Sequence, residues 1–213
     1  MEPVCYIVGA MEPGELRFAP HRPRLVIAAD RGLYYLERRG IRPDLIVGDF
    51  DSLGRTPEGE NVLRHPVEKD DTDMLLAVKE GLARGLKTFV LYGGLGGRPD
   101  HAYANLQTLT FLAERGAAGY LLGEDFAASA VRGGAMDFPA DLTGTVSVFC
   151  PDGRAEGVAL RGLYYPLENA SLTSGFPLGV SNRFTGRPAR VSAERGTLLV
   201  MWRETAAHLM ERL

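Results

Sequence analysis

The sequence predicts an N-terminal α/β domain, in which helices cover a parallel sheet in three layers, followed by a C-terminal antiparallel β-sandwich. Across residues 4–124, short apolar runs alternate with segments whose apolar residues recur every three or four positions. Such alternation requires helical crossovers between parallel strands. From about Arg132 onward we expect no helix, because short β-rich runs are cut by Gly, Pro and Asp turns. That second pattern is typical of an antiparallel β domain.

The first domain is expected to span residues 1–132. Its strands are predicted where short runs are almost wholly apolar, at residues 4–8, 24–29, 45–47, 62–65, 88–92 and 120–122. Its helices are predicted between these strands, where the apolar spacing is helical, at residues 32–39, 72–84 and 100–115.

The second domain is expected to span residues 133–213, with the boundary near the glycine pair Gly133 and Gly134. Its strands are predicted at residues 145–150, 156–161, 189–192 and 197–202, where β-branched and aromatic residues gather between turn residues.

The length and composition are typical of a globular enzyme, and the net charge gives no broad basic surface. The chain has 213 residues, of which 45% are hydrophobic, and a net charge of −3, so nucleic acid is not an expected partner. The N-terminus has no signal-peptide pattern and no apolar run reaches membrane-spanning length, so we expect a cytoplasmic protein without membrane contact. Cys5 and Cys150 both lie in apolar runs and are expected to be reduced core thiols.

Aspartates gather after three of the predicted strands. Between residues 44 and 101 the chain has seven of them, at positions 44, 49, 51, 70, 71, 73 and 100. Because the carboxyl ends of parallel strands meet at one edge of a sheet, these clusters are expected to converge where α/β sheets bind ligands. Carboxylates that lie close together repel one another unless a cation sits between them, and hard oxygen ligands suit Mg²⁺. The sequence therefore predicts a site for a metal and a phosphate.

The first cluster is Asp49-Phe50-Asp51. Alternate residues that leave a strand point the same way, so Asp49 and Asp51 can face one cation while Phe50 enters the core. An ordinary Asp-rich turn is the alternative.

The second cluster, Asp70-Asp71-Thr72-Asp73, opens a predicted helix. Helix capping explains one or two such residues. Three acids exceed what a cap needs, so Asp70 or Asp73 is expected to face the metal.

The third cluster follows a glycine-rich loop, in which four of the five residues from 93 to 97 are glycine. Glycines let the backbone approach a phosphate and offer N-H groups to it. Arg98 can donate two hydrogen bonds to phosphate oxygens, and Asp100 begins a helix that carries His101 and Asn105 on one face. A flexible turn with Asp100 as an ordinary N-cap is the alternative.

A fourth segment, Asp30-Arg31-Gly32, leads from a predicted strand directly into a helix. Exposed amides in such a turn suit an anion or a nucleoside, and a plain strand-to-helix turn is the alternative.

Together these segments resemble the thiamine pyrophosphokinase family. The resemblance is carried, in order along the chain, by residues 29–32, 43–52, 69–73, 93–101 with Asn105, 162–167 and 179–182. Arg31 is a departure, because the family usually has glycine at that position. The resemblance implies transfer of the pyrophosphoryl group of ATP to the hydroxyl of thiamine, with Mg²⁺ as cofactor, thiamine diphosphate and AMP as products, and a homodimer with thiamine sites between subunits.

The residues expected to act fall into four groups, partly from their chemistry and partly from the resemblance. Catalytic roles are expected for Asp51, Asp73, Arg98 and Asp100, and metal binding for Asp49, Asp51, Asp70, Asp73 and Asp100. Nucleotide binding is expected for Asp30, Gly32, Gly94, Gly96, Gly97, Arg98, His101 and Asn105. Thiamine binding is expected for Asp49, Ser181, Asn182 and Trp202, although a lone tryptophan that ends a β-rich run is also typical of a core.

The sequence is also compatible with two other functions. A Mg²⁺-dependent phosphohydrolase would also use strand-end acids such as Asp49 and Asp51 and would need no second substrate. A non-catalytic nucleotide-binding module is the other, although it would gain little from several carboxylates that repel one another without metal.

Overall fold

The structure, a computed structural model, describes residues 2–66, 68 and 70–213. Lys69, which belongs to the second acidic motif, lies outside these described residues. The chain forms two compact units. The first comprises Met1–Thr108, Gly119–Asp125 and Thr205–Leu213, and the second comprises Leu109–Ala118 and Phe126–Glu204.

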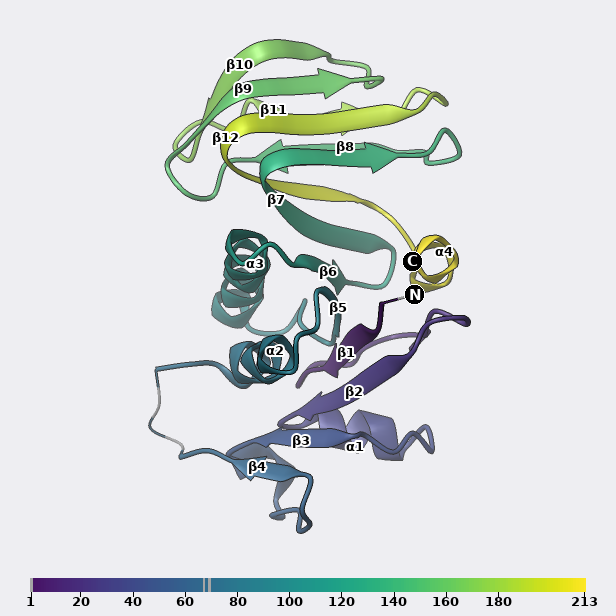
Figure 1. Ribbon diagram of the computed structural model, residues 1–213, viewed down its shortest axis with the longest axis vertical. Coiled ribbons are helices and arrows are strands. Elements are labelled where there is room, and N and C mark those ends of the chain that lie inside the picture. Colours follow the sequence, from purple (N-terminus) through teal and green to yellow (C-terminus); the bar gives the residue numbers. More distant parts are fainter. Residues whose placement is uncertain (1, 67, 69) are drawn as a thin grey trace. The chain divides into compact units, whose positions relative to one another are not determined.

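The first unit is built on a sheet whose strand order is β6-β5-β1-β2-β3-β4 (Figure 1). The strands are β1 (Val4–Val8), β2 (Arg24–Ala29), β3 (Leu45–Gly48), β4 (Val62–Arg64), β5 (Thr88–Tyr92) and β6 (Ala118–Leu122). The pairs β1–β2, β1–β5, β2–β3 and β3–β4 are all parallel. All five residues of β1 are buried, as expected of a central strand covered on both faces.

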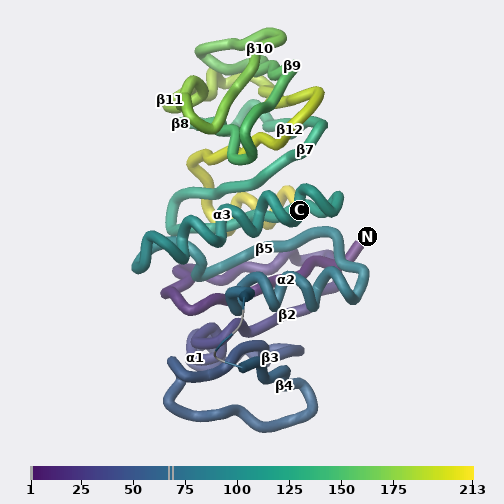
Figure 2. Tube along the Cα trace, turned by 90° about the vertical axis from the view of Figure 1, so that its left-hand side faces the viewer, coloured from purple at the N-terminus to yellow at the C-terminus, as the bar shows by residue number. Residues whose placement is uncertain are grey.

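Helices α1 (Gly32–Glu37) and α2 (Asp73–Ala83) cover this sheet, α1 behind it and α2 in front of it in Figure 1. Figure 2 shows the same two helices on opposite sides of the strands. In α2 the buried residues Met74, Ala77, Val78 and Gly81 recur at the helical spacing that predicted it. The first unit also contains the short helix η1 (Asp51–Leu53), and α3 (Pro99–Glu114) begins in this unit.

The parallel register brings the carboxyl ends of the strands to one edge. Val8 at the end of β1 pairs with Ala28 of β2 on one side and with Tyr92 of β5 on the other. Ala29 at the end of β2 pairs in turn with Val47 of β3. The loops that follow β1, β2, β3 and β5 therefore start side by side.

The second unit is an antiparallel β-sandwich. Its strands are β7 (Phe126–Phe138), β8 (Thr145–Phe149), β9 (Arg154–Arg161), β10 (Leu167–Thr173), β11 (Gly179–Arg183) and β12 (Ala189–Arg203). The long strand β12 pairs with β9 through its first half and with β8 through its second half, and it pairs with β7 along both. The pairing of β12 with β7 has a register shift between Ala193 and Thr197, where β12 changes its other partner from β9 to β8.

Several elements differ from the expectations. The boundary expected between residues 132 and 133 falls inside β7, which pairs with β12 on both sides of Gly133–Gly134. Strands β7, β10 and β11 were not expected, and β12 is one strand where two were expected, at residues 189–192 and 197–202. The expectation of no helix beyond Arg132 is wrong, because α4 (Ala206–Arg212) ends the chain and belongs to the first unit. Thr205 caps α4 by accepting a hydrogen bond from the N-H of His208.

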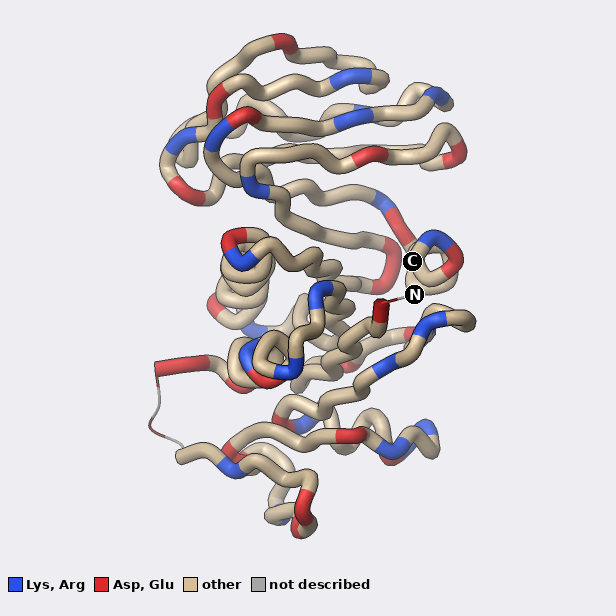
Figure 3. Tube along the Cα trace, viewed as in Figure 1, with Lys and Arg blue, Asp and Glu red and all other residues tan. Residues whose placement is uncertain are grey.

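Charge is spread over the chain. Figure 3 shows Lys and Arg interspersed with Asp and Glu in both units. In the part of the chain that the structure describes, none of the helices is long and apolar enough to cross a membrane.

Candidate active site

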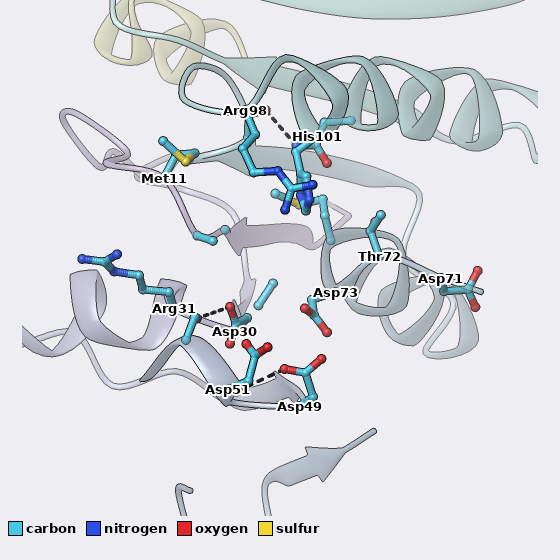
Figure 4. A pocket seen from close by; sticks show the side chains of 18 residues that line it. Met11, Asp30, Arg31, Asp49, Asp51, Asp71, Thr72, Asp73, Arg98 and His101 are labelled. Carbon is cyan, nitrogen blue, oxygen red and sulfur yellow. Dashed lines mark hydrogen bonds between the residues drawn. The ribbon is translucent and has the colours of Figure 1, made fainter. Parts of the chain in front are cut away.

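A pocket of about 560 Å³ lies in the first unit, where the loops after β1, β2, β3 and β5 meet the first turns of α2 and α3 (Figure 4). Eleven of the residues that line it are polar or charged, and they include acids from three different loops. The lining residues are Gly9, Ala10, Met11, Ala29, Asp30, Arg31, Asp49, Asp51, Ser52, Asp71, Thr72, Asp73, Met74, Gly93, Gly94, Arg98, His101 and Asn105.

Three of these acids form a compact cluster. Asp30, Asp49 and Asp51 each place one carboxylate oxygen within 4.8 Å of the others. Asp30 follows β2 and is buried, Asp49 follows β3 and is partly buried, and Asp51 opens η1 and is exposed. Convergence of Asp49 and Asp51 was predicted from sequence, whereas Asp30 was expected to bind the nucleotide and was not counted among the metal ligands.

The carboxylate of Asp30 is held in an unusual environment. The Ser52 hydroxyl donates a short hydrogen bond to its Oδ2, whereas its Oδ1 is buried without a hydrogen-bond partner among the described residues. A buried charged oxygen without a partner is costly, and a bound cation would offset that cost. Three carboxylates in an all-oxygen donor set are the ligands that Mg²⁺ prefers, so these residues fit a magnesium ion.

The backbone between β3 and η1 is shaped to bring these acids together. Gly48 has a φ of +155°, and a side chain at this position would press on the backbone of Asp30, 3.2 Å away. Phe50 adopts a left-handed conformation, with a φ of 66°, and its ring is buried as expected. The backbone N-H of Asp51 donates to Oδ1 of Asp49 at 3.2 Å, which holds the Asp49 carboxylate against the start of η1.

The residues at the start of α2 differ in their contacts. Thr72 caps the helix, since its hydroxyl accepts a hydrogen bond from the N-H of Leu75 at 3.2 Å. Asp73 lies in the first turn, and Figure 4 shows its carboxylate pointing toward those of Asp49 and Asp51. Asp71 lines the pocket and pairs with Lys79 at 2.6 Å. Asp70, which was expected as a possible metal ligand, is exposed and is not among the lining residues.

The glycine-rich loop after β5 reaches the pocket through its first half. Gly93 and Gly94 line the pocket, whereas Gly96 and Gly97 do not. Asn105 is buried and its side-chain amide donates to the carbonyl of Gly94 at 2.7 Å, so it holds this loop in place. His101, one turn before Asn105, also lines the pocket.

Arg98 points into the pocket and is paired with Asp100. Its Nη2 and Nε donate to the two carboxylate oxygens of Asp100 at 2.6 and 3.2 Å. The hydrogen bond from Arg98 is the main reason that the pKa of the Asp100 carboxyl lies below its ordinary value. Asp100 is exposed and is not among the lining residues, so it contacts Arg98 and not the carboxylate cluster.

Gly32 has a packing role and does not line the pocket. It is buried at the start of α1, where a Cβ atom would overlap the carbonyl of Val8 at the end of β1. Glycine therefore allows α1 to approach β1 closely.

The residues expected to bind thiamine lie in the second unit. Ser181 is exposed and has a φ of 59°. Asn182 is buried and hydrogen-bonds both the N-H and the carbonyl of Tyr165, at 2.9 and 2.7 Å. Trp202 is 2% exposed, packs edge-to-face on Phe138 and donates from its indole N-H to Glu204. The packing of Trp202 is that of a core residue, so it is not available to stack on a ligand.

Sequence reasoning did not single out the segment after β1. Gly9, Ala10 and Met11 line the pocket because β1 is the central strand and ends at the same edge as its neighbours. The apolar run from Val4 to Val8 had predicted the strand, and its position between β2 and β5 would have placed this loop at the site.

Two sequence models match most of the chain. The model described as "Thiamin pyrophosphokinase, catalytic domain" matches residues 21–118. The model described as "Thiamin pyrophosphokinase, vitamin B1 binding domain" matches residues 136–198. The first match contains most of the pocket, and the second lies within the β-sandwich.

Comparison with individual proteins finds relatives of the same family. Thiamine pyrophosphokinase of Bacillus subtilis is 29% identical over 188 residues, which cover 85% of this chain and 87% of that protein. The crystal structure of a thiamine pyrophosphokinase from Bacillus subtilis aligns with a TM-score of 0.80 and 25% identity, over 95% of this chain and 99% of that one. A thiamin pyrophosphokinase family protein from Enterococcus faecalis aligns with a TM-score of 0.78 and 26% identity, over 94% and 98% of the two chains.

Proposed function

The chain belongs to the thiamin pyrophosphokinase family, and we propose that it transfers the pyrophosphoryl group of ATP to the hydroxyl of thiamine, giving thiamine diphosphate and AMP. The observation that carries this proposal is the carboxylate cluster of Asp30, Asp49 and Asp51 in a pocket that also holds Arg98. Transfer of a phosphoryl or pyrophosphoryl group needs positioning and neutralisation of charge more than covalent chemistry from the protein.

The carboxylate cluster is the proposed metal site. Asp30, Asp49 and Asp51 would hold Mg²⁺, which when bound supplies positive charge to the phosphate oxygens during transfer. The buried oxygen of Asp30 that has no hydrogen-bond partner among the described residues supports this assignment. Asp73, whose carboxylate points toward the cluster, is proposed to accept the proton of the thiamine hydroxyl.

Arg98 and the loop after β5 are proposed to bind the phosphates. A guanidinium matches phosphate oxygens in a bidentate arrangement, and Asp100 holds Arg98 in place through two hydrogen bonds. Gly94, fixed by Asn105, allows the nucleotide to lie close to the backbone.

A homodimer, with thiamine bound between subunits, is part of the proposal. The second unit exposes five large hydrophobic side chains that come from two neighbouring segments: Tyr164, Tyr165, Phe176, Leu178 and Val180. We call these five residues the apolar patch. Ser181 adjoins the patch and is exposed, so its hydroxyl is free to meet a ligand at such an interface. Within this proposal the enzyme acts in the cytoplasm, where Cys5 and Cys150, both unpaired, would stay reduced.

The test is a measurement of AMP release from ATP and Mg²⁺, with and without thiamine. The proposal expects AMP to form only when thiamine is present, in equal amount to thiamine diphosphate. A phosphohydrolase would release phosphate without thiamine, and a nucleotide-binding module would bind ATP without turnover. Either result would overturn the proposed function.

A further inference from the structure

Arg31 carries a further inference, which rests on the proposed function. We propose that its guanidinium binds the β- or γ-phosphate of the nucleotide, at a point of the pocket distinct from the carboxylate cluster. Arg31 would then be a second phosphate-binding arginine, in addition to Arg98.

The first observation is that Arg31 lines the pocket but does not pair with its acids. Figure 4 shows the side chain of Arg31 turned away from the carboxylates of Asp30 and Asp51. Within residues 2–66, 68 and 70–213, no carboxylate forms an ion pair with Arg31. Arg98, the other arginine of the pocket, is paired with Asp100. Arg31 is thus the pocket arginine whose charge is available to a ligand.

The second observation is that Arg31 shares an aromatic support with another cation. Its guanidinium carbon lies 5.7 Å from the ring centre of Tyr34 and 6.0 Å from that of Tyr35. Arg38 lies 5.5 Å from the same Tyr34 ring and donates to its hydroxyl at 3.2 Å. Like Arg31, Arg38 forms no ion pair with a described carboxylate.

Two guanidinium groups around one ring repel each other, and an exposed aromatic ring compensates for that repulsion only weakly. A bound anion would offset it. The anionic part of the proposed substrates is the phosphate chain of ATP, since thiamine is a cation and adenosine is neutral. A guanidinium is also the side chain whose donors match phosphate oxygens best.

The backbone of Arg31 is fixed although its side chain is exposed. The carbonyl of Arg31 accepts a hydrogen bond from the N-H of Tyr34 at 3.0 Å, and Gly32 packs against the end of β1. The Cα atom of Arg31 is therefore held at the edge of the pocket. The exposed side chain can still rotate, so its N-H donors can turn toward a phosphate.

The test is calorimetric titration of the full chain with ATP and Mg²⁺ in the absence of thiamine, so that no transfer occurs. Arg31→Gln is expected to bind ATP about tenfold more weakly than the unaltered chain, the effect of losing one charge-assisted contact. Arg31→Lys keeps the charge, so its affinity for ATP is expected to lie between those of Arg31→Gln and the unaltered chain. The difference in ATP affinity between Arg31→Gln and the unaltered chain should become smaller as the salt concentration rises.

Two controls make the result specific. Arg42→Gln removes an exposed arginine that precedes β3, at the edge of the sheet opposite the pocket, and is expected to leave ATP binding unchanged. AMP, which lacks the β- and γ-phosphates, should bind Arg31→Gln as well as it binds the unaltered chain.

The outcomes separate this inference from the proposed function. Unchanged ATP binding by Arg31→Gln, or an equal loss of AMP binding, would overturn the role of Arg31 and leave the proposed function standing. Failure of the unaltered chain to bind ATP would overturn both.

Discussion

At the scale of single residues, the site depends on how the carboxylates of Asp30, Asp49 and Asp51 are held near one another. Asp30 is the clearest case, since it is buried at 7% exposure, adopts a φ of 49° and accepts from Ser52. Aspartate and asparagine tolerate this left-handed conformation better than most residues do. The sequence motif therefore serves both the backbone and the proposed metal.

The exposed member of the cluster gives the cleanest test of metal binding. Asp51→Asn is expected to lower turnover about a hundredfold, because a ligand and its charge are lost. Mg²⁺ with ATP should raise the melting temperature of the unaltered chain by about 5 to 10 °C and raise that of the variant much less. Thermal unfolding with and without Mg²⁺-ATP measures this.

Glu58→Gln is the matched control, since Glu58 is an exposed acid in the loop after η1 and does not line the pocket. It should retain the full ligand-induced shift. An equal shift in Asp51→Asn would remove Asp51 from the metal site.

Buried Cys5 makes stability depend on alkaline pH. Burial raises the pKa of its thiol from an ordinary 9.0 to about 12. Between these values the folded chain binds one proton more than the unfolded chain, so the free energy of unfolding falls as pH rises above 9. Urea unfolding over this range should show a shallower decline in Cys5→Ala than in the unaltered chain. Parallel declines in the two proteins would contradict the assignment.

The sequence predicted the convergence of the acidic loops but not every role in it. Strand ends followed by aspartate were sufficient to place Asp49 and Asp51 at one edge. The second cluster left Asp70 and Asp73 as alternatives, and of these two Asp73 lines the pocket. The convergence of Asp30 with Asp49 and Asp51 was missed, because the turn into a helix suggested a nucleotide contact. The pairing of Asp100 with Arg98 is a matter of side-chain rotamers, which spacing does not show.

At the scale of elements, α1 is positioned by a glycine that the sequence had suggested for ligand binding. Gly32→Ala would force a methyl group against the carbonyl of Val8 and is expected to lower the free energy of unfolding by about 2 kcal/mol. Chemical denaturation measures this directly.

Gly175→Ala is the control, because open space surrounds that position and no left-handed φ is required. It should change the free energy of unfolding by less than about 0.5 kcal/mol. Equal effects of the two substitutions would show that Gly32 is not a packing constraint.

Most strands and helices of the first unit were predictable because buried strands and amphipathic helices leave clear periodicities. The strands and the helix that were missed have only weak periodicities in their sequences. Only Leu172 of the seven residues in β10 is fully buried, so its apolar pattern is faint. The glycines in the middle of β7 resemble a break between domains, although β12 pairs with the residues around them. Helix α4 spans only Ala206–Arg212, about two turns, which is too short for periodicity to identify.

At the scale of the whole molecule, each unit has its own core and its own exposed feature. The first has the acidic pocket, and the second has the apolar patch, in which Tyr164 and Phe176 are 56% and 65% exposed. Several large exposed apolar side chains within residues 164–180 are typical of an interaction surface. The dimer proposed above would cover this patch with a second copy.

Light scattering after size-exclusion chromatography tests the dimer. The unaltered chain should have twice the mass of one chain, and Leu178→Asp should shift it toward the monomer by placing a charge in the interface. Glu168→Asp, a conservative change at an exposed position of β10, should stay dimeric. A monomeric unaltered chain would contradict the proposal.

The most direct test of the central claim is a crystal structure of the protein with Mn²⁺ and a non-hydrolysable ATP analogue, recorded at the manganese absorption edge. The account predicts an anomalous peak within bonding distance of carboxylate oxygens of Asp30, Asp49 and Asp51, with the phosphates in the pocket of Figure 4. A nucleotide bound elsewhere, or a metal ion that touches none of these three carboxylates, would contradict it.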